Sequence, residues 1–306
     1  MNTLDFLIIG AQKSATTALF KYLQSHHAVD MPADKEAPLF TDTVDEASLQ
    51  TFMATHFSNS DASRIRGKAT PQYMCDAAVP ARIKAHNPDI KLIAVLREPI
   101  DRAWSQYRMN RRRETERRSF DTAMKALLAP QQLVRARAGK APMHAQHYEP
   151  EGDYYLVWSE YGRILEGYLA HFAPQQLLVL FTQDIEHQPA ETLDRVLVFL
   201  GLEPGFRPSG LGEVVHKGGD SQIISKRVKD AIRHLAPVCF IWSRVPEARK
   251  QALRYWFEQR NVRTSNQAVE LEAATWHAVR EHFAADNRRL EAITGVTPPW
   301  SADSPH

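Results

Sequence analysis

Groups suited to binding an anion gather in one short loop near the start of the chain. Residues 10–17 read GAQKSATT and supply one lysine and three hydroxyls, on Lys13, Ser14, Thr16 and Thr17. The loop follows the apolar run at residues 5–10, and residues 16–25 after it carry apolar side chains at helical spacing. Because a helix N-terminus presents unpaired N–H groups, this strand, loop and helix predict a phosphate or sulfate site.

A second candidate anion site lies further along the chain. Arg97 directly follows the apolar run KLIAVL at residues 91–96, and Ser105 is on the helix expected after it. A guanidinium can make two parallel charge-assisted hydrogen bonds to a phosphate, and a hydroxyl can add a third. The alternative is that Arg97 pairs with Glu98 or Asp101 and that Ser105 only occupies a helix face.

The first loop is not a standard nucleotide-triphosphate loop. That motif needs glycine six residues before and one residue before its lysine, where this chain has Leu7 and Gln12. A P-loop-type nucleotide kinase would also need a magnesium-binding acidic pair, and the sequence offers no clear one. The kinase therefore stays an alternative of lower rank.

Three apolar runs, each followed by a helical pattern, indicate the fold. They are residues 5–10, 91–96 and 176–181, with helices expected at residues 16–25, from Pro99 through Tyr107, and at 190–200 before Gly201. Strands that alternate with helices predict an α/β fold with a central parallel sheet flanked by helices, similar to P-loop proteins. Further helical patterns, mostly toward the C-terminus, cover residues 161–172, 225–235, 248–257 and 271–290.

Composition limits the class of protein. A hydrophobic content of 43% can fill one core in 306 residues, so we expect one domain over residues 1–306, with its core at about 4–292 and a tail at 298–306. The 38 basic and 36 acidic residues leave a formal charge of +2, which argues against a nucleic-acid-binding face. Any anion site must therefore be local.

The chain start and the cysteines bear on location and metal binding. The start has no basic segment and only a six-residue apolar run at 6–11, so we expect no secretory signal, no membrane insertion and a cytoplasmic location. Cys75 and Cys239 have no metal-ligand spacing, and we expect both to be reduced and no metal to be bound.

The stretch GAQKSATTALFKYL resembles the 5′-phosphosulfate loop of sulfotransferases that use 3′-phosphoadenosine 5′-phosphosulfate (PAPS). The usual form is Lys-x-Gly-Thr-Thr/Ser before a helix, and here Ala15 stands at the glycine position. Lys13, Thr16 and Thr17 are in place. The backbone at Ala15 must then avoid torsion angles that only glycine adopts.

Further stretches resemble the same family. LIAVLREPIDRAWSQY is similar to the motif whose Arg and Ser hold the 3′-phosphate, which implies that role for Arg97 and Ser105. Residues 34–40 (DKEAPLF) and 67–73 (GKATPQY) look like segments of the heparan sulfate sulfotransferase branch and its bacterial relatives. Residues 215–221 (VHKGGDS) resemble a variant of the nucleotide-covering loop. Together these matches cover roughly residues 4–292.

The resemblance implies transfer of a sulfuryl group from PAPS, without a metal, to a hydroxyl or amine of a carbohydrate, lipid or small-molecule acceptor. It implies that Glu36 is the general base and that Lys13 and Lys68 stabilise charge on the sulfuryl group and the bridging oxygen. The residues implied to bind the donor are Lys13, Ser14, Ala15, Thr16, Thr17, Arg97, Ser105, His216, Lys217, Gly218 and Gly219.

Each of these roles has a plainer alternative. Lys68 could be an exposed lysine, Glu36 could only pair with Lys35 or with a surface arginine, and His216 could be a structural residue. The chain could also be a non-catalytic nucleotide-binding protein, although a pure binder has no need of a base and a second lysine. The acceptor and the oligomeric state are left open by the sequence.

Six arginines lie within residues 108–118 (RMNRRRETERR), relieved by Glu114 and Glu116. Such a run is typical of a solvated helix or loop, or of the border of a cleft that attracts acidic acceptors. On either interpretation, replacing Arg111, Arg112 and Arg113 leaves donor binding unchanged.

Overall fold

The structure is a computed structural model that describes residues 3–37, 39–41, 44–58, 61, 63–139, 151–213, 245 and 269–300. In this part of the chain, five strands form one sheet in the order β2-β3-β1-β4-β5, and all neighbouring pairs are parallel. The strands are β1 (Phe6–Gly10), β2 (Val29–Asp30), β3 (Ile65–Ala69), β4 (Lys91–Leu96) and β5 (Leu177–Phe181). The predicted α/β fold with a parallel sheet is confirmed.

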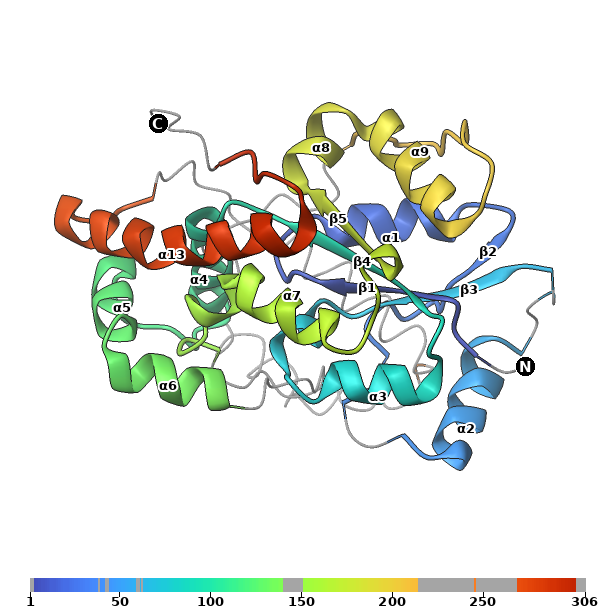
Figure 1. Cartoon of the computed structure of the whole chain (residues 1–306), viewed down its shortest axis with the longest axis horizontal. Helices are drawn as coiled ribbons and strands as arrows, with labels where there is room; N and C mark the ends of the chain where they lie inside the picture. The colour runs from blue at the N-terminus through green and yellow to red at the C-terminus, as the bar shows by residue number, and fades with distance from the viewer. Residues whose placement is uncertain are drawn as a thin grey trace.

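Helices connect and cover these strands (Figure 1). The α-helices described are α1 (Thr16–Gln24), α2 (Glu46–His56), α3 (Val79–His86), α4 (Pro99–Arg112), α5 (Phe120–Leu127), α6 (Pro130–Ala138), α7 (Tyr161–Leu169), α8 (Thr182–His187), α9 (Pro189–Leu200) and α13 (Ala273–Thr294). Short 3-10 turns are η1 (Pro71–Cys75), η2 (Val157–Ser159) and η3 (Pro174–Gln176). Of the helices in these ranges, none is long and apolar enough to cross a membrane.

The central strand β1 is buried on both faces. Its side chains alternate, so that Leu7 and Ile9 enter one hydrophobic cluster and Phe6 and Ile8 enter another. The first cluster includes side chains of α3 and α7, and the second includes side chains of α1 and α9. Figure 1 shows α1, α8 and α9 on one side of the sheet and α3 and α7 on the other. This burial on both faces explains why β1 is a continuous apolar run.

The predicted elements that fall within the described residues agree with the structure to within a few residues. The runs at residues 5–10, 91–96 and 176–181 form β1, β4 and β5, and α9 ends where Gly201 takes a left-handed φ of 84°. The helical pattern at 271–290 corresponds to α13. The helices expected at 225–235 and 248–257 lie outside the described residues, and the single domain over 1–306 remains a prediction.

The sequence pattern did not indicate strand β3. Its sequence, IRGKA, carries two cations and a glycine instead of an apolar run. The strand forms because Gly67 packs under the ring of Phe6 on β1, where a Cβ would lie 2.0 Å from Cζ of that ring. Pairing with β1 places Lys68 beside Leu7. Sheet register, and not local hydrophobicity, defines this strand.

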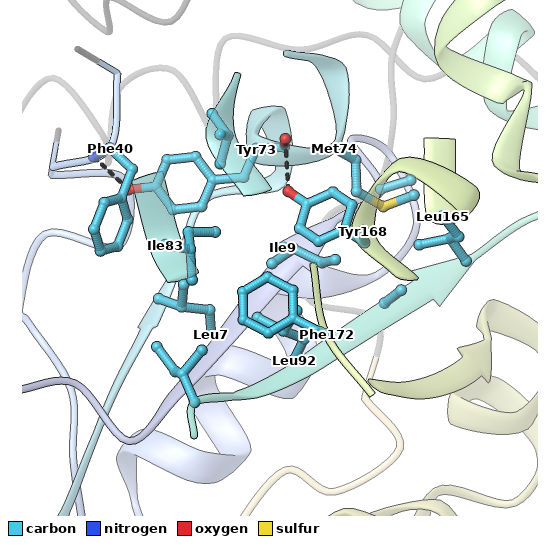
Figure 2. Packing of buried hydrophobic residues seen from close by; sticks show 14 of the residues in the cluster. Leu7, Ile9, Phe40, Tyr73, Met74, Ile83, Leu92, Leu165, Tyr168 and Phe172 are labelled. Carbon is cyan, nitrogen blue, oxygen red and sulfur yellow. Dashed lines mark hydrogen bonds between the residues drawn. The ribbon is translucent and has the colours of Figure 1, made fainter. Parts of the chain in front are cut away.

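Tyr73 connects two segments that carry candidate site residues. Its hydroxyl accepts a hydrogen bond of 3.3 Å from the backbone N–H of Phe40, and its carbonyl accepts one of 2.8 Å from the hydroxyl of Tyr168. Figure 2 shows both bonds, with the rings packed over Leu7, Ile9 and other core residues. The segment before Phe40 is thereby held next to η1, at the end of β3.

Candidate active site

The candidate residues lie near the carboxyl ends of three adjacent strands. The loop at residues 11–15 follows β1, Lys68 is in β3, and Arg97 follows β4. Because β3, β1 and β4 are parallel neighbours, their carboxyl ends meet at one edge of the sheet. Ligands of open α/β sheets bind at this edge, next to helix N-termini.

The loop after β1 adopts a strained conformation. Lys13 has a φ of 72°, and Ala15, the residue that precedes α1, has φ 59° and ψ 12°. An L-residue can occupy this left-handed region at a cost of about 1–2 kcal/mol, whereas glycine occupies it freely. Ala15 therefore keeps a conformation that glycine would adopt at lower cost. Ser14 and Thr16 are buried beside it, and Thr17 is half-buried.

Positive charges surround Lys13. Burial, with a smaller contribution from Arg112, Arg113 and Arg97, lowers the pKa of Lys13 to about 7, while the Glu151 carboxylate opposes them. Arg112 and Arg113 are therefore within electrostatic reach of the loop. That replacing Arg111, Arg112 and Arg113 leaves donor binding unchanged stays a prediction, and two of these arginines act on the charge of a residue in the loop. A cluster of cations with one carboxylate favours the arrival of an anion.

A buried hydrogen-bonded network is joined to the loop at residues 11–15 through Gln12. The amide nitrogen of Gln12 lies 3.4 Å from each oxygen of Glu151, and the amide nitrogen of Gln106 lies 3.4 Å from one of them. Burial raises the pKa of Glu151, although Arg113 and Gln12 counteract this effect. The oxygen of Gln106 accepts a hydrogen bond of 3.0 Å from Arg102. Sequence reasoning missed this network because Glu151 lies far from every motif and has no distinctive neighbours.

Arg97 and Ser105 are near the start and the middle of α4. The guanidinium of Arg97 lies 3.7 Å from Asp101, and the two side chains are 34% and 48% exposed. An ion pair this exposed contributes at most about 1 kcal/mol, so it leaves Arg97 available to a ligand. Glu98 instead caps α4 by accepting a hydrogen bond of 2.6 Å from the N–H of Asp101. The half-buried Ser105 lies one helical turn beyond Asp101.

Lys68 is not an exposed lysine. Its side chain is fully buried, donates a hydrogen bond to the hydroxyl of Thr70, and lies 5.3 Å from the centre of the Tyr73 ring. Burial lowers the pKa of Lys68 to about 7, against the attraction of Glu36 and Asp34. A buried ammonium of this kind gains stability when further negative charge arrives.

Glu36 forms an ion pair with its neighbour Lys35, which is the pairing expected if Glu36 were not the base. The ammonium of Lys35 lies 3.3 Å from the Glu36 carboxylate and donates a second hydrogen bond of 3.3 Å to the hydroxyl of Thr16. The pair is therefore joined to the first residue of α1. Burial acts to raise the pKa of Glu36, but Lys35, together with Lys68 and Gln72, holds it below its usual value. Glu36 is a carboxylate at neutral pH.

The remaining candidate residues either lie outside the described part of the chain or are unreactive. Residues 216–219, including His216, and Cys239 lie outside the described residues. Cys75 is a free, half-buried cysteine, and burial raises the pKa of its thiol well above its usual value. Among the residues described, no group of three or more His, Cys, Asp or Glu could hold a metal ion.

Comparison with known proteins identifies the family. The sulfotransferase domain profile matches residues 3–217, which is more than half of the chain. The chain belongs to the sulfotransferase domain family. The predicted resemblance is confirmed, including its nearness to heparan sulfate sulfotransferases.

Two curated relatives illustrate this nearness. Bifunctional heparan sulfate N-deacetylase/N-sulfotransferase 4 of Mus musculus is 29% identical over 210 residues, which are 67% of this chain and 23% of that protein. Heparan sulfate glucosamine 3-O-sulfotransferase 3B1 of Homo sapiens is 29% identical over 198 residues, which are 64% of this chain and 46% of that protein. The match thus spans less than half the length of either relative.

A solved structure supports the fold of this sulfotransferase-family chain. The crystal structure of a sulfotransferase from Alicyclobacillus acidocaldarius superposes with a TM-score of 0.62 and 22% sequence identity. The match covers 95% of this chain and 96% of that one. The likeness extends beyond residue 217, where the match to the family profile ends.

Proposed function

We propose that this chain transfers a sulfuryl group from PAPS to a hydroxyl or amine of an acceptor, and that the acceptor is first to be sought among carbohydrates. Family membership supports the reaction type, and the names of the heparan sulfate relatives support the acceptor class. The observation that carries the proposal is a fully buried Lys68 within electrostatic reach of Glu36, whose partner Lys35 contacts Thr16 at the end of the loop at residues 11–15, here called the anion loop. A fully buried lysine is costly unless a bound anion repays it.

The proposed reaction needs no covalent enzyme intermediate. The acceptor oxygen or nitrogen forms a bond to sulfur while Glu36 takes the acceptor proton. The bond between sulfur and the bridging oxygen breaks, and its electron pair remains on adenosine 3′,5′-bisphosphate. Lys13 and Lys68 stabilise the charge that develops on the sulfuryl group and the bridging oxygen. Proton removal by a positioned base contributes about 10²–10⁴-fold in rate.

Donor binding is assigned to two groups of residues. Lys13, Thr16, Thr17 and the backbone around them would hold the phosphosulfate at the N-terminus of α1. Arg97 and Ser105 would hold the 3′-phosphate, with residues 216–219 over the nucleotide. The proposal requires no metal ion, because lysine and arginine side chains supply the positive charge.

Ligand binding tests the donor assignment. Adenosine 3′,5′-bisphosphate should raise the melting temperature without magnesium, and at 100 times its Kd it should add about 2.7 kcal/mol to the free energy of unfolding. Arg97→Ala should remove most of this effect. Arg195→Ala is the control, because Arg195 forms a similar exposed ion pair, 3.4 Å from Asp184, on α9. Protection by ATP with magnesium, and none by the bisphosphate, would replace this proposal with a nucleotide kinase.

Turnover tests the catalytic assignment. Glu36→Gln keeps the size and hydrogen-bonding capacity of the side chain but removes its basic oxygen. We expect the variant to bind the bisphosphate normally and to lose on the order of 10²-fold in transfer of radiolabelled sulfuryl groups to desulfated heparan sulfate oligosaccharides or to water. Turnover within a few-fold of the original enzyme would show that Glu36 is not the base.

A further inference from the structure

Lys35 occupies an unusual position between the base and the anion loop. Its side chain is only 14% exposed, whereas that of Glu36 is 39% exposed. Its one ammonium group donates to a Glu36 oxygen and to the Thr16 hydroxyl, each over 3.3 Å. A lysine that only neutralised a surface carboxylate would remain in solvent, where its ammonium is best hydrated. Here it is largely withdrawn from solvent, and both of its side-chain contacts are candidate site residues.

The two contacts connect segments that are otherwise separate. Thr16 begins α1, directly after the anion loop, whereas Glu36 lies in the turn after β2. The hydrogen bond from the Phe40 N–H to the Tyr73 hydroxyl holds the far end of the Glu36 segment, and Lys35 holds its near end. Within the described ranges, Lys35 is thus the side chain that connects the Glu36 carboxylate to Thr16 by hydrogen bonds.

We propose that Lys35 is a positioning residue for sulfuryl transfer, which holds the Glu36 carboxylate against the anion loop through Thr16 and keeps it ionised. This inference rests on the proposed function, because it assigns Lys35 to the same reaction. Lys35 does not exchange a proton in the step. It orients the carboxylate that accepts the acceptor proton, and it occupies one lone pair of the Thr16 oxygen, so that the Thr16 O–H can point elsewhere.

The charges around Glu36 show what removing Lys35 would change. Burial raises the pKa of Glu36, and the opposing groups are, in order, Lys35, Lys68 and Gln72. Asp34 and His56 also act on this site, since Asp34 attracts Lys68 and interacts electrostatically with His56. Lys35 provides the largest opposing effect, through both an ion pair and a hydrogen bond over 3.3 Å. Its loss would remove the largest of the effects that lower the pKa of Glu36.

Titration of Glu36 itself tests the inference without an identified acceptor. The protein is labelled at its glutamate carboxyl carbons, and the Glu36 resonance is assigned by its absence in Glu36→Gln. In Lys35→Met, which keeps the length of the side chain without its charge, the midpoint should move to higher pH. In Lys35→Arg, which keeps the charge, it should stay near its original position. Lys21→Met, an exposed lysine on α1, is the control.

Turnover with water as the acceptor supplies the kinetic test. Water replaces the acceptor in the same bond changes, and release of inorganic sulfate from PAPS is measured between pH 6 and pH 8. We expect Lys35→Met to lose about tenfold or more at pH 6 and less at pH 8, where Glu36 is ionised in either protein. Lys35→Arg should recover most of the rate, and the bisphosphate Kd should change by less than about fivefold in both variants.

The outcomes separate the two proposals. Coincident Glu36 midpoints in Lys35→Met and the original protein, or an equal loss of rate at both pH values, would overturn the role of Lys35 alone. Failure of the original protein to bind the bisphosphate would overturn the proposed function, and with it the assignment of Lys35 to sulfuryl transfer. A shifted midpoint, a loss of rate confined to low pH and rescue by arginine together support the inference.

Discussion

Replacing Lys68 by methionine should make the protein more stable near neutral pH while it abolishes sulfuryl transfer. Lys68 is fully buried, and burial lowers its pKa from 10.5 to about 7. Between these two pH values the unfolded chain holds the Lys68 proton more firmly than the folded protein does. The free energy of unfolding therefore rises with pH over this interval. Methionine has a similar length, is apolar and does not titrate.

The magnitude follows from the change in pKa. One pKa unit corresponds to 1.36 kcal/mol, so the protonated Lys68 destabilises the folded protein near pH 7 by up to about 5 kcal/mol. Loss of the hydrogen bond to Thr70 offsets about 1–2 kcal/mol of the gain in the variant. We expect Lys68→Met to be more stable at pH 7 by up to about 3–4 kcal/mol, and this advantage to disappear or reverse toward pH 10.

Urea unfolding followed by tryptophan fluorescence, at several pH values from 7 to 10, measures both quantities. Comparison of the two proteins cancels every other group that titrates in this range. Lys21→Met, an exposed lysine on α1, should follow the original protein at every pH. If Lys68→Met is less stable at pH 7, or if its difference from the original protein does not depend on pH, the burial and the altered ionisation of Lys68 are wrong. A stabilised but inactive variant would be typical of a residue retained for function at the expense of stability.

Three further outcomes are expected. Affinity for adenosine 3′,5′-bisphosphate should fall as the pH rises above 7, because a bound anion raises the pKa of Lys13 and Lys68 from about 7 and binding therefore takes up protons. Calorimetry in buffers of different ionisation enthalpy should detect this proton uptake at pH 8, and its absence would contradict the site. Ala15→Gly should raise the free energy of unfolding by about 0.5–1 kcal/mol, because removing the strain of the left-handed conformation at Ala15 outweighs the greater conformational entropy that glycine gives the unfolded chain. A loss of stability would show that the loop has another conformation. Gly162→Ala on α7 should lower the free energy of unfolding in urea by about 2 kcal/mol or more, because its Cβ would lie 2.4 Å from the carbonyl oxygen of Asp286 on α13. Gly167→Ala is the control, because Gly167 is also on α7 but faces open space, and it should cost nothing. Equal effects of the two changes would place α13 elsewhere.

Local patterns accounted for much of the fold. The run DFLIIG, the loop GAQKSATT and the helix after it could be interpreted from the sequence, because apolar spacing and a loop rich in hydroxyls act within a few residues. The same holds for β4 with Pro99 at the start of α4. Strand β3 could not be predicted in this way, because the packing of Gly67 under Phe6 depends on a residue from another strand.

The residue types of the site also followed from sequence, through their likeness to sulfotransferase motifs. The motifs alone predicted four of the site residues that the structure places around one sheet edge, namely Lys13, Glu36, Lys68 and Arg97. Their roles in catalysis and donor binding stay predictions. Their partners did not follow from the sequence. Nothing in the spacing indicated that Glu151 supports the loop through Gln12.

What the sequence alone determined is the alternation of β1, β4 and β5 with the helices that follow them, the family and the residues able to bind an anion. Only the tertiary structure decided that Lys68 is fully buried, that Lys35 turns from solvent to join Glu36 to Thr16, and that Arg112 acts on Lys13. The physical reason is that secondary structure depends mainly on near neighbours in the chain. The ionisation of a side chain depends on the water excluded and the charges brought near by residues that are distant in sequence.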